Sequence, residues 1–464
     1  MKTKHILTSL VMIFTVCLGL SAQSETMYER GATYLENTMP PSPEPASIVK
    51  YADVPFTHST GMAEYDVPFY TLQGRELSIP ISLHYASGGI KLDEIAGVAG
   101  LGWTLNAGGC VTRTVMDLPD EFESYMLHHE MPEGLLLTAL ENRVDTTFTL
   151  NYLRNLLYHK IDSSLDRYSY NVCGLSGTFV IQDDGTVFQL SGDGVLIDYT
   201  READGSIGTF TITGPDGTVY TCSEKETGTH DGQGTTLPGP LTGEADRWSA
   251  TTAWHMTSMR SRSGFEMAEF TYSEPEEWKR VVRSRSQTMS VTWPIDPYQS
   301  NLSPQIESSS KYIHTTYSTK VLSGIVFDGT AVSFSYLKGP SYCRRTGDSS
   351  YQQNFPFILD EITVQVQGNP NEVARLDVSC ISAPYDGRIL LNGLHLYKED
   401  VLDDKWSFTY RSVGCEVSRG SQDWYGYYNG ENEFSDNGTG RVFPFEFRPS
   451  FNSPELTNGH PNPE

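Results

Sequence analysis

The chain has 464 residues, of which 38% are hydrophobic and 20% are charged, so it can bury a large core and lacks the composition of a disordered or collagen-like chain. Its 58 acidic residues outnumber its 33 basic residues by 25. Such an acidic surface repels phosphate backbones, which excludes nucleic acid as the expected partner. The length allows about three domains at roughly 150 residues each.

Residues 1–22 have the three parts of a secretory signal peptide. Two lysines form a positive start, an apolar run extends from Ile6 to Leu20, and the small Ala22 precedes Gln23, where we expect cleavage. No later segment has about 18 uninterrupted apolar residues, so we expect no transmembrane segment in the mature chain. We therefore expect export to the periplasm, the outer cell surface or the extracellular space.

Residues 23–47 are interpreted as a Pro-rich tether, because the prolines in Met39–Pro45 favour extended backbone and disfavour a helix. A β region is expected over 48–117. Within it, apolar residues occupy every odd position of Leu77–Tyr85, which is typical of a half-buried strand. Pro80 cannot donate a ladder hydrogen bond, so this strand is expected at a sheet edge or a bulge.

The segment from Ser87 to Gly109 contains seven glycines and the run GLGWTLNAGG. Its glycines are not spaced as G-x-G-x-x-G and no Gly-Lys-Ser/Thr follows, so a nucleotide-binding loop is not supported. We expect a tight loop in which glycines allow positive φ angles and close backbone packing around the tryptophan. The residues assigned to this structural motif are Gly88, Gly89, Gly97, Gly100, Gly102, Trp103, Asn106, Gly108 and Gly109.

A helical insert is expected over 118–165, because this segment is poor in glycine and holds apolar residues spaced as on one helix face. The body, 166–448, alternates apolar and polar residues and contains Asp-Gly-Thr turns beginning at Asp184, Asp216 and Asp328. Asp-Gly favours tight hairpins. A flexible tail is expected over 449–464. The predicted fold is mainly β, with antiparallel hairpin-rich sheets in a sandwich or partial shell and a small helical insert.

The sequence contains no pattern typical of a catalytic, metal or cofactor site. No histidine belongs to an H-E-x-x-H motif, and we expect His84 and His395 to face solvent. Gly174–Gly177 is one residue short of the G-x-S-x-G nucleophile elbow. The six cysteines after the signal peptide have no Cys-x-x-Cys and allow 15 pairings, although a buried free thiol is favoured for Cys380. We assign no catalytic residue, metal or cofactor and expect a protein that is not an enzyme.

Two sugar-related functions stay open as alternatives. The 26 Tyr, 20 Phe and 7 Trp residues can form sugar-stacking surfaces, although strand-rich cores also use aromatic residues. A carbohydrate-binding surface adhesin is therefore the main alternative. A glycoside hydrolase is less favoured, because acidic pairs such as Asp183-Asp184 are more typical of solvated turns than of two carboxyls facing a sugar.

Three segments carry a family resemblance: Pro45–Tyr51, Gly61–Tyr70 and Leu77–Val115. In this order they resemble the amino-terminal region of secreted Rhs-type (YD-repeat) proteins of the Bacteroidetes kind. Pro80–Asn106 is also similar to the opening of insecticidal toxin-complex B components. Weaker similarity continues to Asp423–Gly430, and the 118–165 insert is the least alike.

The resemblance implies a β-rich, secreted or surface-exposed protein whose later YD repeats coil into a hollow β shell. This chain has a single YD-like unit, Tyr385–Arg388, so we expect it to be the front portion of a longer architecture. The resembled region is structural in the family, so no catalytic residue carries over. The expected function is an exported, non-enzymatic β-rich module in structural assembly or surface interaction, with a YD-repeat protein or a surface glycan as partner.

Overall fold

The computed structural model describes residues 38–50, 63–87, 94–116, 118–121, 164–182, 184–192, 194–231, 247–290, 305–339, 344–346, 350–352, 355–367, 372–382 and 388–410. These residues belong to two compact units, the smaller of which contains 38–39, 114–116, 118–121 and 164–166. The predicted signal peptide with Ala22 and Gln23, the glycines Gly88 and Gly89, most of the 118–165 insert and the 449–464 tail lie outside the described residues.

In the smaller unit, β1 (Thr38–Met39) pairs antiparallel with the last residues of β5 (Gly109–Met116). The buried Asp166 carboxylate accepts hydrogen bonds from the backbone N–H groups of Met116 at 2.8 Å and Asp120 at 3.2 Å. The Asp120 carboxylate accepts the Asp166 N–H in return. These bonds join the two ends of the segment predicted as an insert.

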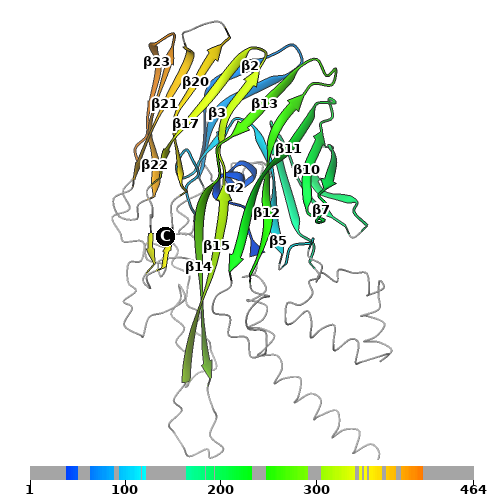
Figure 1. Cartoon of the computed structure of the whole chain (residues 1–464). Helices are drawn as coiled ribbons and strands as arrows, with labels where there is room; N and C mark the ends of the chain where they lie inside the picture. Colours follow the sequence, from blue (N-terminus) through cyan, green and yellow to red (C-terminus); the bar gives the residue numbers. More distant parts are fainter. Residues whose placement is uncertain are drawn as a thin grey trace, which may run out of the picture. The chain divides into compact units, whose positions relative to one another are not determined.

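The larger unit confirms the expected mainly β, antiparallel fold (Figure 1). One continuous run of antiparallel pairings passes in turn through β9 (Leu196–Arg201), β10 (Ile207–Thr213), β11 (Val219–Asp231), β12 (Arg247–Arg260), β13 (Met267–Tyr272), β16 (Leu322–Phe327), β17 (Thr330–Lys338), β20 (Phe357–Val366), β21 (Glu372–Ser382), β22 (Ile389–Lys398) and β23 (Val401–Ser407).

Two strands of this run are long enough to pair with two different neighbours along one side. β11 pairs with β10 near its start and, over 227–231, with β15 (Gln305–Thr319), which forms a hairpin with β14 (Glu276–Ser290). β12 pairs with β13 near its end and with β5 over 253–255. β6 (Arg167–Val172), β7 (Leu175–Ile181) and β8 (Val187–Gly192) pair in succession, and β18 (Arg344–Thr346) with β19 (Ser350–Gln352) forms a separate two-stranded sheet. The sheet therefore branches on either side of β11 and β12.

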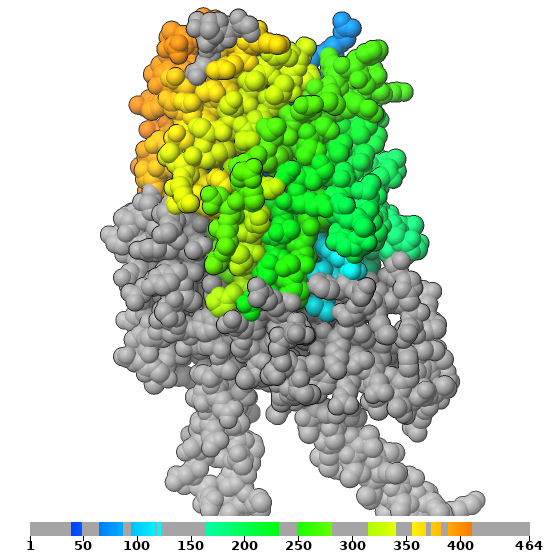
Figure 2. Space-filling model, viewed as in Figure 1, coloured from blue at the N-terminus to red at the C-terminus, as the bar shows by residue number. Residues whose placement is uncertain are grey.

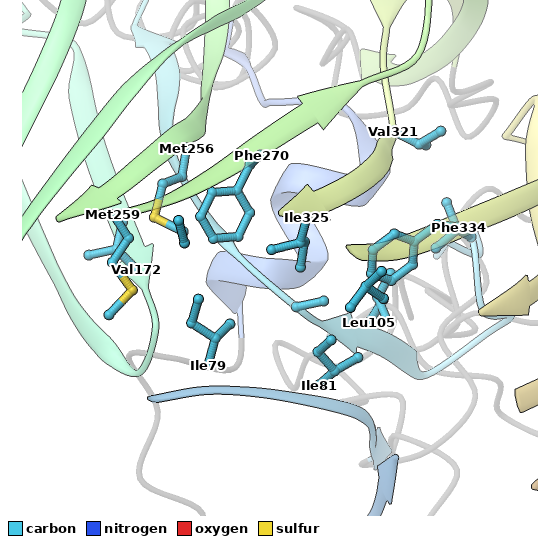
Figure 3. Close-up of a cluster of buried hydrophobic side chains, with 14 of the residues drawn as sticks. Ile79, Ile81, Leu105, Val172, Met256, Met259, Phe270, Val321, Ile325 and Phe334 are labelled. Atoms are coloured by element: carbon cyan, nitrogen blue, oxygen red, sulfur yellow. The ribbon is translucent and has the colours of Figure 1, made fainter. Parts of the chain in front are cut away.

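A separate three-stranded sheet of β2 (Ala63–Gln73), β3 (Ser78–Ser87) and β4 (Trp103–Asn106) packs against the larger sheet. Figure 3 shows Ile79 and Ile81 of β3 pointing toward Phe270 and Ile325 of the larger sheet. Leu77, Ile79, Ile81 and Leu83 are all at most 2% exposed, as their odd-position alternation predicts. The core of the larger unit lies between these two sheets.

Of the edge or bulge predicted for the Leu77–Tyr85 strand, the edge is wrong, whereas the pairing of β3 with β2 does contain a bulge, at Pro68–Tyr70 opposite Ser82 and Ile81 and next to Pro80. β3 is the middle strand of its sheet, between β2 and β4. However, β4 pairs only with Ser82–Tyr85, so Pro80 lies beyond the end of this pairing and has only Thr71 of β2 opposite it. The missing N–H of Pro80 is tolerated because no described strand pairs with it on the β4 side.

The extended backbone predicted for 23–47 is wrong over Pro43–Ser47, because Pro43–Lys50 forms the helix α2. The Ala46 N–H donates to the Ser42 carbonyl at 3.0 Å, which places Pro43 at the first helical position and Pro45 in the first turn. N–H groups of the first turn have no acceptor within the helix, so proline is compatible with both positions. Figure 1 shows α2 among the strands of the larger unit.

The hairpin predicted at Asp328-Gly329 is confirmed. Both residues have positive φ angles, 45° and 73°, and they join β16 to β17. This is the conformation that a two-residue turn needs to match the twist of the flanking strands. At the other two Asp-Gly-Thr turns, the Asp184 and Asp216 carboxylates accept the N–H groups of Thr186 and Thr218 at 2.8 and 2.9 Å.

Candidate functional site

The glycine motif connects the small sheet to two strands of the large sheet, β22 and β6. Gly100 and Gly102 have φ angles of +102° and +78°. A Cβ atom on Gly100 would lie 2.8 Å from the backbone nitrogen of Leu391, and one on Gly109 would lie 2.5 Å from the carbonyl oxygen of Asn171. Glycine is therefore needed at Gly100 for both conformation and packing. Gly108 has only ordinary contacts, and Asn106 is exposed.

Trp103 is the main buried side chain of the motif, at 3% exposure. Its ring centroid lies 5.1 Å from that of Tyr85 and 4.8 Å from that of Phe408. Its indole N–H donates to the Tyr410 hydroxyl at 3.2 Å. Contacts with these two aromatic neighbours hold the Trp103 ring in a fixed position.

Two hollows flank the motif, and α2 contributes to both. The first, which we name the acidic cavity, has a volume of about 30 Å³ and is lined by Glu44, Ile48, Leu105, Asn106, Ala107, Gly108, Gly109, His255, Tyr272, Lys320, Val321, Leu322 and Tyr336. The second, the tryptophan pocket, has a volume of about 170 Å³ and is lined by Pro40, Pro41, Pro43, Ala46, Ser47, Glu94, Ile95, Gly97, Gly100, Gly102, Trp103, Thr104, Trp278 and Arg280.

Two buried glutamates lie near the point where the sheet branches: Glu44 lines the acidic cavity, and Glu226 contacts its lining residues His255 and Lys320. Glu226 of β11 is fully buried, and its carboxylate accepts the Ser42 hydroxyl at 2.6 Å and the Lys320 N–H at 2.8 Å. His255 Nε2 lies 3.2 Å from Glu226 Oε1 without hydrogen-bond geometry, so this contact is electrostatic. Glu44 of α2 accepts the Val98 N–H at 3.0 Å.

Burial raises the pKa of Glu44 to about 7, and the charge of Glu226 acts in the same direction. The Val98 N–H bond and His255 partly oppose this effect, because both favour the charged carboxylate. A cavity of about 30 Å³ has room for only one or two water molecules and not for a sugar ring. The arrangement therefore anchors α2 and the Lys320 backbone to β11.

The sequence contained one signal for this cluster that the motif search missed. In β11, Tyr220, Cys222 and Glu226 share one alternation phase, and all three are buried. A carboxylate on the apolar phase of a strand needs buried donors. Nothing local identified those donors, because Ser42 and Lys320 come from distant segments.

Two residues that line the tryptophan pocket also carry a buried polar atom with no hydrogen-bond partner. Thr104 is 6% exposed, and its hydroxyl oxygen has no hydrogen-bond partner. Arg280 Nε is also buried without a partner. Both residues line the pocket with Trp103 and Trp278, which are 3% and 1% exposed. Neither atom has accessible surface, so neither can contact a molecule in the pocket, and the Arg280 side chain is engaged with the Tyr317 hydroxyl. The pocket is a candidate binding site on its volume of about 170 Å³ and its mixed lining.

The four cysteines that the structure describes, Cys110, Cys173, Cys222 and Cys380, are free thiols. Burial raises the pKa of Cys173 and of Cys380 to about 12, which keeps both thiols protonated and unreactive near neutral pH. Cys380 is partly rather than fully buried. His84 and His395 are also partly buried, and His84 Nδ1 lies 2.6 Å from Asp66 Oδ1.

No protein-family model matches the chain, and no curated protein has significant sequence similarity to it. Within the described ranges, no group of three or more His, Cys, Asp or Glu side chains is placed to hold a metal ion. Across the same ranges, no helix has the length and hydrophobicity needed to cross a lipid bilayer.

Proposed function

We propose that this protein is an exported, non-enzymatic β-rich module that acts in assembly, by pairing β23 with a strand of a YD-repeat partner. The observation that carries the proposal is the exposed edge of the large sheet at β23. In the described part of the chain, β23 pairs in register only with β22. Its first five residues are exposed, and the orange atoms in Figure 2 place this end of the chain's described part at the surface.

An edge strand presents N–H and C=O groups that another strand can pair with. Val401 and Leu402 are 68% and 50% exposed, which adds apolar area to this edge. Asp403 and Asp404 are exposed as well, and the Lys398 ammonium lies 2.6 Å from the Asp403 carboxylate. Charges at an edge discourage indiscriminate pairing, so the partner strand should carry a basic residue opposite Asp404. The family resemblance supports a YD-repeat protein as this partner, because its repeats are strands.

The test is co-expression with a YD-repeat protein encoded next to this chain, followed by pull-down and measurement of the dissociation constant. The double variant Val401→Lys, Leu402→Lys places two charges on the edge and should weaken association by about tenfold or more. The matched control is Leu190→Lys, Leu196→Lys, because these side chains are 50% and 61% exposed on β8 and β9.

The control should bind like the wild type. A wild-type chain that stays monomeric beside the co-expressed protein would overturn the proposal. Equal weakening by both double variants would overturn the assignment to β23.

A further inference from the structure

We infer that the edge strand β8 pairs with β8 of a second copy of this chain, so that two copies form a dimer across a two-fold axis at Phe188. β8 ends the succession β6, β7, β8, and in the described part of the chain it pairs in register only with β7. Figure 1 shows β7 and β23 on opposite sides of the larger unit, so this contact is separate from the β23 edge and does not depend on the proposed assembly role.

The β8 edge lacks the features that usually keep an edge strand from pairing. Its sequence, VFQLSG, contains no charged residue and no proline, and five of its six residues are exposed. The two large apolar side chains, Phe188 and Leu190, are 52% and 50% exposed. Charges and prolines normally protect sheet edges, so an uncharged apolar edge is a template for another strand.

The β7–β8 hairpin determines which backbone groups of β8 face outward. The Gln182 N–H donates to the Thr186 carbonyl at 2.9 Å, so these residues form a hydrogen-bonded pair at the turn. Hydrogen-bonded and non-hydrogen-bonded pairs alternate along an antiparallel ladder. Val187 and Gln189 are therefore in non-hydrogen-bonded pairs with β7, and their N–H and C=O groups point away from it.

These outward groups match a two-fold axis at Phe188. Such an axis places Val187 of one copy opposite Gln189 of the other, and each of these pairs can exchange two N–H···O bonds. Phe188 then lies opposite Phe188 of the second copy in a non-hydrogen-bonded pair, where facing side chains are closest. An aromatic pair at this position is favourable.

A bulge limits the contact to a short segment. Leu190 has no partner on β7, because the register shifts between Thr178 and Phe179. Bulges twist an edge strand away from regular pairing, so the contact extends over 186–190 and no further. Because the axis uses the same edge of both copies, the pair is closed and does not grow into a fibre.

The charges favour a second copy as the occupant of this edge. The chain has a formal net charge of −25, so two copies repel one another at long range. This repulsion is screened beyond about 8 Å at physiological ionic strength, and an uncharged strand adds none where the copies touch. By contrast, β23 carries Asp403 and Asp404, which favour a basic partner.

The first experiment is sedimentation equilibrium of the full mature chain over a series of concentrations. The mass should rise from that of one chain to that of two. Raising NaCl from about 50 to about 500 mM should strengthen the association, because it screens the repulsion between copies without weakening an uncharged contact. The mass of one chain at every concentration, or weaker association at high salt, would overturn the inference.

The second experiment places a charge on the axis. Phe188→Lys brings two ammonium groups opposite each other and should weaken self-association by about tenfold or more. The matched control is Phe265→Lys, the same substitution at a ring that is 92% exposed between β12 and β13. The control should associate like the wild type, and equal weakening by both variants would overturn the assignment to β8.

The third experiment tests the position of the axis. Facing Cβ atoms in a non-hydrogen-bonded pair are close enough for a disulfide, so Phe188→Cys should form a linked dimer with oxidised glutathione. Phe265→Cys is more exposed but lies away from the axis, so it should cross-link far more slowly. Equal rates on a non-reducing gel would mean random collision and would contradict the predicted register.

The two edges can be tested independently. Leu190→Lys, Leu196→Lys should weaken self-association and still bind the YD-repeat protein, whereas Val401→Lys, Leu402→Lys should do the reverse. Loss of the YD-repeat protein in Phe188→Lys would identify that protein as the occupant of β8 and would overturn the inference of a second copy.

Discussion

At the scale of single residues, Trp103 joins the glycine motif to both sheets of the larger unit. It lies on β4 of the small sheet, and its ring contacts Phe408, which follows β23 of the large sheet. The same ring forms a wall of the tryptophan pocket. One side chain therefore contributes to core packing and to the shape of the candidate site.

Trp103→Ala should lower the free energy of unfolding by about 3–5 kcal/mol, because it removes a large ring that is almost fully buried and leaves a cavity. Urea denaturation followed by circular dichroism measures this change. Phe265→Ala is the control, since this ring is 92% exposed at a hairpin tip and its loss should change stability by less than about 0.5 kcal/mol. A similar small loss for Trp103→Ala would mean that the ring is not part of the core.

At the scale of elements, the turn before β4 determines how the small sheet meets β22. The Leu101 N–H donates to the Ile389 carbonyl at 2.8 Å, and the Leu359 N–H donates to the Val98 carbonyl at 2.9 Å. These backbone bonds hold the motif against β20 and β22. The turn must approach those strands closely, which leaves no room for a side chain at Gly100.

Gly100→Ala should therefore lower the free energy of unfolding by about 2 kcal/mol or more. The new methyl group would force an unfavourable φ near +102° and lie 2.8 Å from the Leu391 nitrogen. The control is Gly108→Ala in the same motif, where the nearest atom would be 3.7 Å away and the effect should be below about 1 kcal/mol. Equal melting temperatures for the two variants would show that this close approach does not contribute to stability.

At the scale of the whole molecule, the charge of Glu44 links global stability to pH. The pKa of Glu44 is raised from 4.5 to about 7 in the folded protein, so between these values the folded state keeps a proton that the unfolded state has lost. The free energy of unfolding then falls as pH rises through this window, by roughly 3 kcal/mol in total. The protein should be most stable, as far as this residue is concerned, below pH 4.5.

Glu44→Gln removes this titration while keeping an acceptor for the Val98 N–H, so it should flatten the fall in stability between pH 4.5 and 7. Above pH 7 the variant should be more stable than the wild type. Urea denaturation at a series of pH values measures both effects. The exposed Glu274→Gln should keep the wild-type profile, and a Glu44→Gln profile identical to it would contradict the role of Glu44.

The sequence by itself determined the β class, the burial of the odd-numbered side chains of Leu77–Leu83 and the Asp328-Gly329 hairpin. These features depend on neighbouring residues, through alternation and turn chemistry. Export and the relationship to YD-repeat proteins stay predictions.

Only the tertiary structure decided the helix at Pro43–Lys50, the middle position of β3, the burial of Glu44 with Glu226, and the pocket between Thr104 and Arg280. Each depends on partners far away in the chain: Glu44 bonds to Val98, and Ser42 bonds to Glu226 across 184 residues. Local periodicity contains no information about such partners, because it reports which face of an element is apolar and not what that face will meet.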